Sequence, residues 1–492
     1  MRAFTASSVG LKLDPNSRTP MYRQLYDALR AGILAGRLPP GTRLPTQRDL
    51  SSELGVSRNT VMMAFEQLAA EGYLEGRVGA GTYVRDSLPE SLLTVGGSSS
   101  RRGRVRASAQ GLSARGRALA SVDVSLPLSG NIRPFRIGMP DVREFPFGEW
   151  ARIVSRIWRR PPQELVRYGE SQGYAPLREA IAVYAAAVRG VRCDASQVIV
   201  TSGSQQALDL AARVLVDPGD RVWIEDPGYL GARAAFTAAG SQLVPVPVDD
   251  DGLRVDEGER TAPDARAAYV TPSHQFPVCV TMSLARRLAL LDWATRSRAW
   301  VIEDDYDSEY RYAARPLASL QGLDEGGRVL YVGTFSKVMF PSLRLGYLIV
   351  PPGLGEPFTR ARAVVDRHPP SVDQAALAEF IAQGHFGRHV RRMRALYHER
   401  RDLLVDVARR ELGGALDVRL PDTGMHTVGW LASGVDDRAA SKRALEAGVD
   451  VPALSSYRLE PSRAGGLLMG FSAYDAREIV HGVRALAVAF GG

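Results

Sequence analysis

The amino-acid sequence predicts a large α/β domain with a largely parallel β-sheet, preceded by a small helix-turn-helix unit. Beyond residue 132, short apolar runs alternate with stretches of helical spacing, as strands and helices do in parallel sheets. Nearer the start, residues 46–72 contain the signals of two short helices joined by a glycine turn. A chain of 492 residues has room for both units.

The small unit is expected within residues 20–85. Apolar residues at helical spacing predict a first helix over residues 21–34, and a Pro-Pro-Gly cluster follows it. Thr46 is suited to begin the second helix, because Asp49 follows three residues later at the spacing of a capping box. These signals predict two successive helices before the glycine turn.

The third helix of this unit is expected to begin after Ser57, a good capping residue, and to end at Gly72. Its first turn exposes Arg58 and Asn59. In a recognition helix this N-terminal end contacts base edges and phosphates. Residues 73–84 then predict a two-stranded wing with a glycine-rich tip. A small helical domain for protein contacts is the alternative interpretation.

The positive charge is concentrated in the first quarter of the chain. Residues 1–118 contain 17 Lys/Arg and 9 Asp/Glu, an excess of +8. The remainder contains 62 − 17 = 45 basic and 54 − 9 = 45 acidic residues, so it is formally neutral. A basic module attached to a neutral one predicts a polyanion partner for the first part only.

Residues 87–130 predict a flexible linker, because Gly, Ser and Arg dominate there without sustained periodicity. Six arginines fall between Arg101 and Arg117, and contact with phosphates is the alternative to a solvated linker. Elsewhere, hydrophobic content of 45% and charged content of 24% are typical of a soluble globular protein. No signal peptide or membrane span is predicted, so we expect a cytoplasmic protein.

The two cysteines, Cys193 and Cys279, predict neither a disulfide framework nor a zinc site. No metal ligands are therefore proposed from the sequence. Cys279 is interpreted as a small buried hydrophobic residue. His274 is expected to lie near the functional site or to make a structural hydrogen bond.

Six short apolar runs predict strands of the large domain, with a helix after the first of them. The runs are residues 197–201, 221–224, 267–270, 299–302, 329–332 and 345–350, and the helix covers residues 204–215. In such sheets ligands bind beyond the carboxyl ends of the strands. The residues that suggest chemistry gather at those ends.

Lys337 is the most informative of these residues. The chain has three lysines, Lys12, Lys337 and Lys442, within a Lys+Arg total of 62. Arginine replaces lysine as a surface charge, but it cannot form an imine because its guanidinium stays protonated. A lysine within the apolar stretch 331–350 therefore suggests amine chemistry, and burial there would lower its pKa. An ordinary loop lysine is the alternative.

Residues at two other strand ends suit a phosphorylated pyridine cofactor. Gly203 and Ser204 lie at a predicted strand-to-helix turn, where free amides and a hydroxyl suit a phosphate. Asp304 belongs to an acidic run after another predicted strand, and a carboxylate there keeps a pyridine nitrogen protonated. Arg344, seven residues beyond Lys337, can bind phosphate oxygens through two N–H groups.

Several motifs carry a resemblance to known families. PTQRDLSSELGVSRNTV and GRVGAGTYV resemble the GntR family of winged-helix regulators, whereas TPSHQFP, EDDYDSEYRY and GTFSK resemble the aspartate-aminotransferase-like family of pyridoxal-phosphate proteins. In this order they resemble the MocR subfamily of GntR regulators. The resemblance implies a fold-type-I PLP-dependent transferase-like α/β domain with an N-terminal winged helix-turn-helix domain. The implied boundaries are 14–86 for the DNA-binding domain, 87–130 for the linker and 131–492 for the cofactor-binding and dimerisation domain.

The resemblance also implies residue roles. Lys337 would form the Schiff base with pyridoxal phosphate, Asp304 would pair with the pyridine nitrogen, Tyr306 would donate to the ring 3-hydroxyl, and Tyr229 would stack on the ring. The implied phosphate contacts are Gly203, Ser204, Gln205, Thr334, Ser336 and Arg344, with Tyr168 reaching the phosphate of the neighbouring subunit in a homodimer. The implied DNA-binding set is Arg48, Ser57, Arg58, Asn59, Thr60 and Gly81, the last in the wing.

The sequence departs from the family pattern in the cofactor-proximal turn and in the effector contacts. Val278 and Cys279 stand where Thr/Ser-Gly is usual. Gly231 stands where the GABA-responsive member has an arginine for the effector carboxylate, and Arg233 and Arg458 are candidates for substitution but lie out of register. These departures argue against a carboxylate-bearing amine effector and leave room for pyridoxal phosphate itself as the signal.

Together these observations predict a regulator that binds double-stranded DNA as a homodimer, with a small-molecule effector that is pyridoxal phosphate or an amine reacting with its imine. Control of vitamin B6 or amino-compound metabolism is the implied role, with at most weak transamination half-reactions. The alternative is a pyridoxal-phosphate-dependent aminotransferase with an accessory DNA-binding domain. A large domain that only dimerises is disfavoured, because Lys337, Asp304, Tyr306 and Arg344 are all present.

Overall fold

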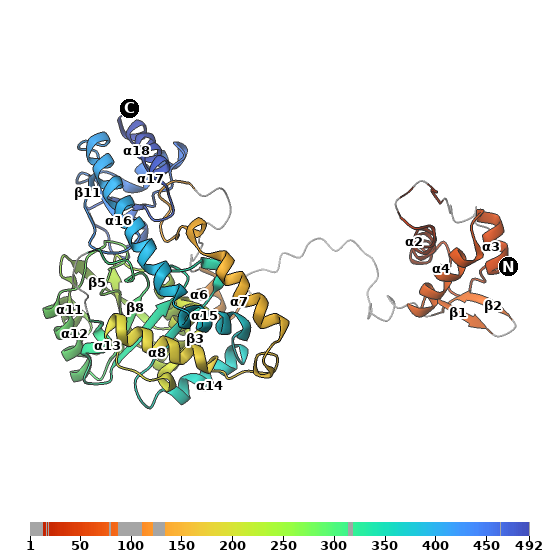
Figure 1. Ribbon diagram of the computed structural model, residues 1–492, viewed down its shortest axis with the longest axis horizontal. Coiled ribbons are helices and arrows are strands. Elements are labelled where there is room, and N and C mark those ends of the chain that lie inside the picture. Colours follow the sequence, from red (N-terminus) through yellow and green to blue (C-terminus); the bar gives the residue numbers. More distant parts are fainter. Residues whose placement is uncertain are drawn as a thin grey trace. The chain divides into compact units, whose positions relative to one another are not determined.

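The computed structural model of the protein describes residues 13–15, 17, 19–77, 80–86, 111–121, 133–312, 318–462 and 464–491. The chain separates into two compact units, Met1–Ser108 and Ala109–Gly492, and each is described by itself (Figure 1). No helix among the described residues is long and apolar enough to cross a membrane.

The first unit contains three helices and a two-stranded wing, as the sequence predicts. The helices are α2 (Met21–Leu34), α3 (Gln47–Leu54) and α4 (Arg58–Ala70), and the wing pairs β1 (Leu74–Arg77) with β2 (Gly81–Val84). Because apolar residues recur every three or four positions, α2 and α4 each present one face to a shared core. That core includes Leu25, Leu29, Val61, Phe65 and Leu68.

Side-chain caps fix where the second and third helices begin. The Thr46 hydroxyl accepts from the Asp49 amide at 3.2 Å, and the Ser57 hydroxyl accepts from the Thr60 amide at 3.1 Å. The turn between the helices places Gly55 at φ +65°, in the left-handed region. The predicted tip of the wing includes Val78 and Gly79, which lie outside the described residues.

One helix, α6 (Ala114–Ser121), lies inside the range 87–130 that is predicted to be a flexible linker. The composition of this range did not predict a helix at these eight residues. The Ser113 hydroxyl caps the start of the helix by accepting from the Gly116 amide at 3.0 Å. Such a cap stabilises a short helix without the hydrophobic periodicity by which helices are recognised in a sequence.

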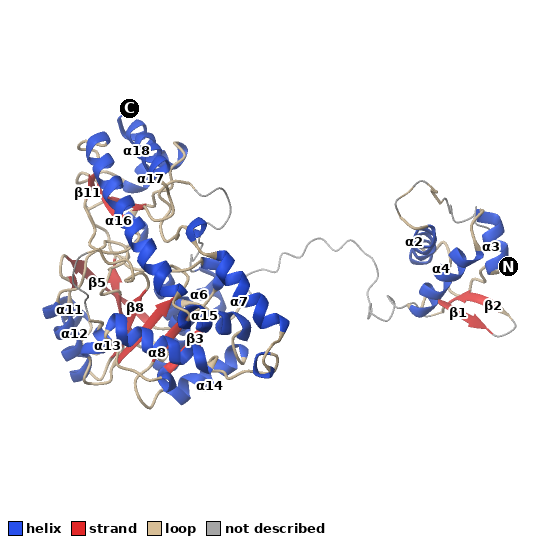
Figure 2. Ribbon diagram, viewed as in Figure 1, coloured by secondary structure: helices blue, strands red, loops and turns tan. Residues whose placement is uncertain are grey.

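The second unit is built on an eight-stranded sheet (Figure 2). Its strand order is β3-β10-β9-β8-β7-β4-β5-β6. The strands are β3 (Val198–Thr201), β4 (Arg221–Asp226), β5 (Gln242–Asp249), β6 (Gly252–Leu253), β7 (Ala267–Val270), β8 (Trp300–Asp305), β9 (Val329–Thr334) and β10 (Gly346–Ile349). The predicted strands all form, and the sheet is largely parallel: only β10, between β9 and β3, and the short β6 run antiparallel to their neighbours.

Helices cover both faces of this sheet, which is why its strands are continuous apolar runs. Along β3, Ile199 faces one core with α9 (Ser204–Leu215) and α10 (Leu230–Ala239), whereas Val198 and Val200 face the opposite core. The opposite core also contains side chains of α7 (Phe147–Arg159), α8 (Ala175–Arg189) and α15 (Ser371–Ala382). The remaining helices beside the sheet are α11 (Val255–Thr261), α12 (Leu284–Arg296), α13 (Leu320–Leu323) and α14 (Gly355–Asp366).

A long helix, α16 (His385–Glu411), extends from the sheet region towards the C-terminal elements (Figure 1). There it packs with α18 (Ala476–Gly491) and a three-stranded sheet in a separate core. The other elements of this region are β11 (Asp417–Val418), β12 (His426–Trp430), β13 (Gly466–Gly470) and α17 (Asp437–Glu446). Single 3-10 turns are η2 (Val142–Glu144), η3 (Gln163–Leu165), η4 (Ala195–Gln197), η5 (Pro341–Leu343) and η6 (Leu454–Tyr457).

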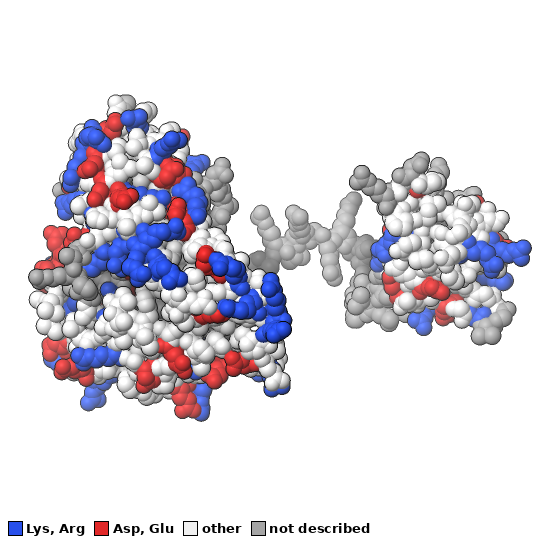
Figure 3. Space-filling model, in the orientation of Figure 1, with Lys and Arg blue, Asp and Glu red and all other residues white. Residues whose placement is uncertain are grey.

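The formal neutrality of the second unit hides an uneven surface. Figure 3 shows Lys and Arg side chains gathered over α16 and α7 on one face. The exposed arginines of these helices are Arg152, Arg156, Arg159, Arg388, Arg391, Arg392, Arg409 and Arg410. Balanced composition therefore coexists with a basic band.

Candidate functional site

Lys337 lies in the connection between β9 and β10, at the edge of the sheet where β8 and β9 end. Its Nζ atom donates a hydrogen bond to the carbonyl oxygen of Gly138 at 2.8 Å. Burial lowers the pKa of Lys337, so the neutral, nucleophilic form of the amine is easier to reach by loss of a proton than in a surface lysine. Asp307 and Asp304 are close enough to counter part of this shift in the pKa of Lys337.

Asp304 ends β8 beside this lysine. Its Oδ2 atom accepts from the Tyr269 hydroxyl at 2.9 Å, while its Oδ1 atom is buried without a hydrogen-bond partner among the described residues. Burial raises the pKa of Asp304 to about 7. A buried carboxylate oxygen without a donor costs free energy, so this atom is poised for an external N–H.

The other acidic residues of the motif have partners. Asp305 accepts from Arg189 at 2.6 Å, the two Glu303 oxygens each accept from a backbone amide at 2.9 Å, and Glu309 accepts from the Tyr184 hydroxyl at 2.9 Å. Asp304 is therefore the only acid of EDDYDSE with a buried oxygen that lacks a partner in the described part of the chain.

Tyr306, two residues beyond Asp304, contacts a buried histidine. The hydroxyl of Tyr306 lies 2.9 Å from His274 Nδ1, which also lies 3.0 Å from the Asp307 carboxylate. Burial alone would lower the pKa of His274, but Asp307 and then Cys279 raise it to about 10. Burial also raises the pKa of Tyr306 well above its ordinary value, so its hydroxyl stays protonated and can donate.

Two segments form an anion cradle. Gly203, the cap of α9, adopts φ +94°, and a Cβ atom there would lie 3.0 Å from Arg344 Nη2. Arg344 donates to the Ser202 carbonyl at 2.6 Å, so its guanidinium lies against the start of α9. The Ser336 hydroxyl is buried and has no hydrogen-bond partner in the described structure. Amides at a helix N-terminus, a guanidinium and a free hydroxyl together suit a phosphate.

The remaining predicted phosphate contacts lie beside this cradle. Ser204 and Gln205 form the first turn of α9. Thr334 ends β9, and its hydroxyl accepts from the Ser336 amide at 3.2 Å. Gln205 donates to the Gly231 carbonyl at 2.9 Å, so its amide group also braces the turn that carries Tyr229.

Tyr229 caps α10, and its ring packs edge-on against Phe276 at 5.8 Å between ring centroids. Burial and then the charge of Asp304 raise the pKa of Tyr229 to about 12, whereas Arg344 opposes the rise. The pKa of Lys337 responds to Asp304 and Arg344 as well. This shared electrostatic influence places the lysine, the free carboxylate, the guanidinium and the aromatic ring in one site.

Tyr168 lies apart from this set within its own chain. Its side chain is 87% exposed, and its ring packs edge-on against His368 at 5.9 Å. Arg233, one candidate effector contact, is buried and pairs with Asp226 at 3.3 Å. Arg458, the other candidate, has a buried Nε atom without a partner among the described residues.

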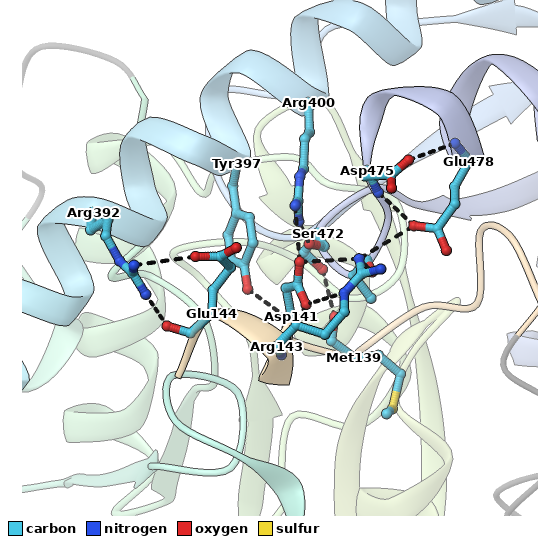
Figure 4. A network of polar contacts seen from close by, with 11 residues as sticks. Met139, Asp141, Arg143, Glu144, Arg392, Tyr397, Arg400, Ser472, Asp475 and Glu478 are labelled. Carbon is cyan, nitrogen blue, oxygen red and sulfur yellow. Dashed lines mark hydrogen bonds and ion pairs between the residues drawn. The ribbon is translucent and has the colours of Figure 1, made fainter. Parts of the chain in front are cut away.

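A polar network holds the segment that presents Gly138 to Lys337 (Figure 4). The Ser472 hydroxyl donates to the Met139 carbonyl at 2.7 Å, and the Asp141 amide donates to the Tyr397 hydroxyl at 2.8 Å. The Asp141 carboxylate accepts from Arg143 and Arg400, each at 2.9 Å. Residues of α16 and of the C-terminal region therefore position a segment more than 200 residues earlier in the chain.

The remaining contacts in Figure 4 extend this network to both sides. Arg392 of α16 pairs with Glu144 at 3.2 Å, and Arg143 pairs with Glu478 at 3.3 Å. Glu478 and Asp475 accept from each other's backbone amides at the start of α18. Sequence reasoning missed Gly138, Tyr269 and this network, because each contact joins residues far apart and none belongs to a recognisable motif.

The predicted DNA-binding residues gather at the start of α4 and at neighbouring positions of the first unit. Ser57, Arg58 and Asn59 are exposed, as is Arg48 on α3. Thr60 is partly buried, and its hydroxyl lies 2.8 Å from that of Ser57. Gly81 begins β2 at φ +108°. A Cβ atom added there would lie 3.2 Å from Arg43 Nε. An exposed basic first turn beside a wing suits contact with a groove and its phosphates.

Comparisons with known proteins agree with this division. The family model described as bacterial regulatory proteins, gntR family, matches residues 21–84, and the model described as aminotransferase class I and II matches residues 144–476. The chain is 42% identical over 480 residues to the probable rhizopine catabolism regulatory protein MocR of Rhizobium meliloti, covering 98% of this chain and 96% of that one. It is 33% identical to the pyridoxine biosynthesis transcriptional regulator PdxR of Corynebacterium glutamicum, covering 94% and 95%.

A solved structure shares the large fold. The α-aminoadipate aminotransferase LysN of Thermus thermophilus, crystallised with N-(5'-phosphopyridoxyl)-L-leucine, aligns with a TM-score of 0.70 at 29% identity, over 76% of this chain and 97% of that one. The large unit is thus a fold-type-I aminotransferase-like domain, and the first unit is a GntR winged helix. The chain belongs to the MocR-type regulators of the GntR family, which join these two domains in one polypeptide.

Proposed function

We propose that this protein is a transcriptional regulator that binds double-stranded DNA through its winged helix and pyridoxal phosphate through its large unit. The observation that carries the proposal is the set of buried polar groups around Lys337, two of which have no hydrogen-bond partner among the described residues. A buried lysine amine, a carboxylate oxygen without a donor and a hydroxyl without a partner lie in one site of the described structure. Each of these three groups would contact a different part of the cofactor.

The residues present fit pyridoxal phosphate. Asp304 Oδ1 would accept from the pyridine N–H, Tyr306 would donate to the 3-hydroxyl, and Tyr229 would pack on the ring. Ser336, Arg344 and the first turn of α9 would hold the phosphate. Bound pyridoxal phosphate supplies an aldehyde that condenses with amines and a ring that withdraws electrons. The protein's part is to keep Lys337 buried with the pKa of its amine lowered, to hold the ring nitrogen protonated and to neutralise the phosphate.

The effector is proposed to be pyridoxal phosphate itself or an amine that reacts with it without an arginine at position 231. A Cβ atom at Gly231 would lie 2.3 Å from Gln205 Oε1 and 2.5 Å from the Tyr229 ring, so a larger side chain there would have to displace both side chains. Arg233 is already paired with Asp226. The name of the relative PdxR, a pyridoxine biosynthesis regulator, favours control of vitamin B6 metabolism, and that of MocR favours catabolism of an amino compound.

A homodimer is part of the proposal. Tyr168 is 87% exposed, and Trp158 and Val166 nearby in the sequence are 57% and 56% exposed. A tyrosine exposed among apolar neighbours is unusual on a monomer and common at an interface. In the proposed dimer Tyr168 reaches the phosphate of the other subunit. Sedimentation of the purified protein as a monomer at micromolar concentration would contradict this part.

A working aminotransferase is the second candidate, because the complete set around Lys337 also serves transamination. Turnover of an amino donor with a keto acid at ordinary enzymatic rates would favour it. The absence of an arginine at position 231 argues against recognition of a substrate carboxylate in the expected way.

Selection from a random duplex library, followed by fluorescence anisotropy on the selected sequence, tests the regulator. We expect specific binding of the wild-type protein and a changed affinity or half-site spacing when pyridoxal phosphate is added. The response to pyridoxal phosphate should be absent in Lys337→Ala. No enrichment and no DNA affinity at low salt would overturn the proposal.

A further inference from the structure

A cluster of three potential metal ligands lies next to the candidate cofactor site. His274, Cys279 and His426 each offer one nitrogen or sulfur atom, and these atoms all lie within 4.8 Å of one another. His274 and His426 are 2% exposed, and Cys279 is partly buried. The cysteine and His426 are 147 residues apart, on the loop after β7 and on β12. Their spacing in the sequence therefore gives no hint of a metal site.

His274 is held in the orientation that a metal ligand needs. Its Nδ1 atom faces the Asp307 carboxylate at 3.0 and 3.1 Å, which leaves Nε2 directed the other way. Nε2 is buried and has no hydrogen-bond partner among the described residues. A carboxylate on one ring nitrogen with the other nitrogen free is the usual arrangement behind a metal-bound histidine. Gly424 packs against the ring, so the ring has little freedom to turn away.

The backbone of Cys279 adopts a conformation that favours glycine. It adopts φ +67°, in the left-handed region that costs a non-glycine residue about 1 kcal/mol. Its Sγ lies 3.4 Å from the Pro277 carbonyl and 3.5 Å from the His426 carbonyl, and the side chain packs beside the apolar cluster of Val428, Leu454 and Leu468.

We propose that His274 Nε2, Cys279 Sγ and a ring nitrogen of His426 bind Zn²⁺. Thiolate and imidazole ligands select Zn²⁺ over Mg²⁺ and Ca²⁺, which prefer oxygen. Bond lengths of about 2.0–2.3 Å place tetrahedral ligand atoms roughly 3.3–3.8 Å apart, so the widest pair has to close by about 1 Å. Binding releases the thiol proton and any proton on His274 Nε2 to solvent. Three protein ligands leave a fourth position for water or an exogenous ligand.

The site would join two parts of the large unit. Cys279 belongs to the loop beyond the eight-stranded sheet, whereas His426 belongs to the C-terminal sheet. Through His274, the metal would also lie one hydrogen bond away from Tyr306. The metal therefore has a structural role, and it would set the orientation of a residue in the cofactor site.

Cobalt titration of the full-length protein without a histidine tag tests the proposal directly. The protein is first freed of metal with a chelator, and difference spectra are recorded as Co²⁺ is added. We expect one equivalent to bind with a thiolate-to-metal charge-transfer band, and Zn²⁺ to displace it. Direct metal analysis of protein exposed to Zn²⁺ and then desalted should give one zinc per chain.

Cys279→Gly is the decisive variant, because glycine removes the sulfur and suits the left-handed backbone. We expect it to fold, to lose the charge-transfer band and to bind Co²⁺ at least about tenfold more weakly. Cys193→Ala is the matched control and should keep the band, while His426→Gln should weaken binding as Cys279→Gly does. Absence of a band in the wild-type protein, or a band retained in Cys279→Gly, would overturn the proposal. The first of these results would leave Cys279 as a thiol hydrogen-bonded to its neighbours.

Discussion

The amine of Lys337 and the carbonyl of Gly138 are joined by a 2.8 Å hydrogen bond across 199 residues of sequence. Gly138 precedes the segment that Ser472, Tyr397 and Arg400 hold in place. The position of the lysine amine is thus coupled to α16 and to the C-terminal region, although both lie outside the motif that carries Lys337.

Lys337→Ala should abolish covalent attachment of pyridoxal phosphate. In the wild-type protein, burial lowers the pKa of this amine and favours its reaction with an aldehyde. We expect a visible absorption band with added cofactor, and borohydride reduction should fix the cofactor on a peptide containing residue 337. Lys442→Ala serves as the control and should behave as the wild type. A band that borohydride fixes elsewhere in the chain would contradict the assignment.

Asp304→Asn should weaken cofactor binding and stabilise the cofactor-free protein at neutral to alkaline pH. Burial raises the pKa of Asp304 from 3.8 to about 7, so the folded state holds a proton that the unfolded state releases. The cofactor-free protein therefore loses stability as the pH rises from about 4 to 7. At pH 8 the asparagine should add on the order of 2 kcal/mol to the free energy of unfolding. Thermal melts at pH 5 and pH 8 measure this difference, which should shrink at pH 5.

Asp141→Asn should have the opposite pH dependence. Burial works to raise the pKa of Asp141, but hydrogen bonds from Arg143 and Arg400 outweigh it and lower that pKa. The carboxylate therefore contributes stability above about pH 4, and this contribution is lost as the pH falls through the lowered value. We expect a loss of about 3 kcal/mol at pH 7, since Arg400 is left buried without its charged partner. Equal melting temperatures for the two proteins at pH 7 would show that the pair adds nothing.

Arg58→Ala and Arg48→Ala should each weaken DNA binding and reduce the slope of log affinity against log salt by about 1. Both arginines are exposed, and Arg58 lies in the first turn of α4. Arg23→Ala is the control, because Arg23 lies on α2 and pairs with Asp27 at 3.5 Å. Fluorescence anisotropy at several salt concentrations separates the phosphate contribution from base contacts. An unchanged slope in both variants would place the DNA elsewhere.

Much of the fold could be predicted because its strands are buried on both faces. The run at residues 267–270 becomes β7 with the same bounds, and the helix at residues 204–215 becomes α9. Strand β5 is not among the predicted strands, since Pro245 and Pro247 interrupt it and proline usually argues against a strand. The structure accommodates them near the sheet edge, where only the two-residue β6 lies beyond β5.

The candidate site divides in a similar way. Lys337, Asp304 and Arg344 could be proposed because each lies in a short motif at a strand end. The Gly138 carbonyl, the Tyr269 hydroxyl and the cluster around Cys279 could not, because they depend on tertiary contacts between distant segments. At α6, local composition suggested a segment without regular structure, but Ala and Arg residues form a helix that hydrophobic periodicity does not reveal.

The pairing of strand β10 limits how the sequence of this protein can evolve. Its residue Gly346 lies opposite Thr334 of β9 on one side and opposite Thr201 of β3 on the other. Gly346 therefore lies beside both strand ends, the one that leads into the connection with Lys337 and the one that leads into the turn at Gly203. Substitutions in residues 335–345 can alter the chemistry one group at a time. An insertion or deletion there would change the position of the Lys337 amine relative to the anion cradle. We therefore expect this connection to vary in composition but not in length.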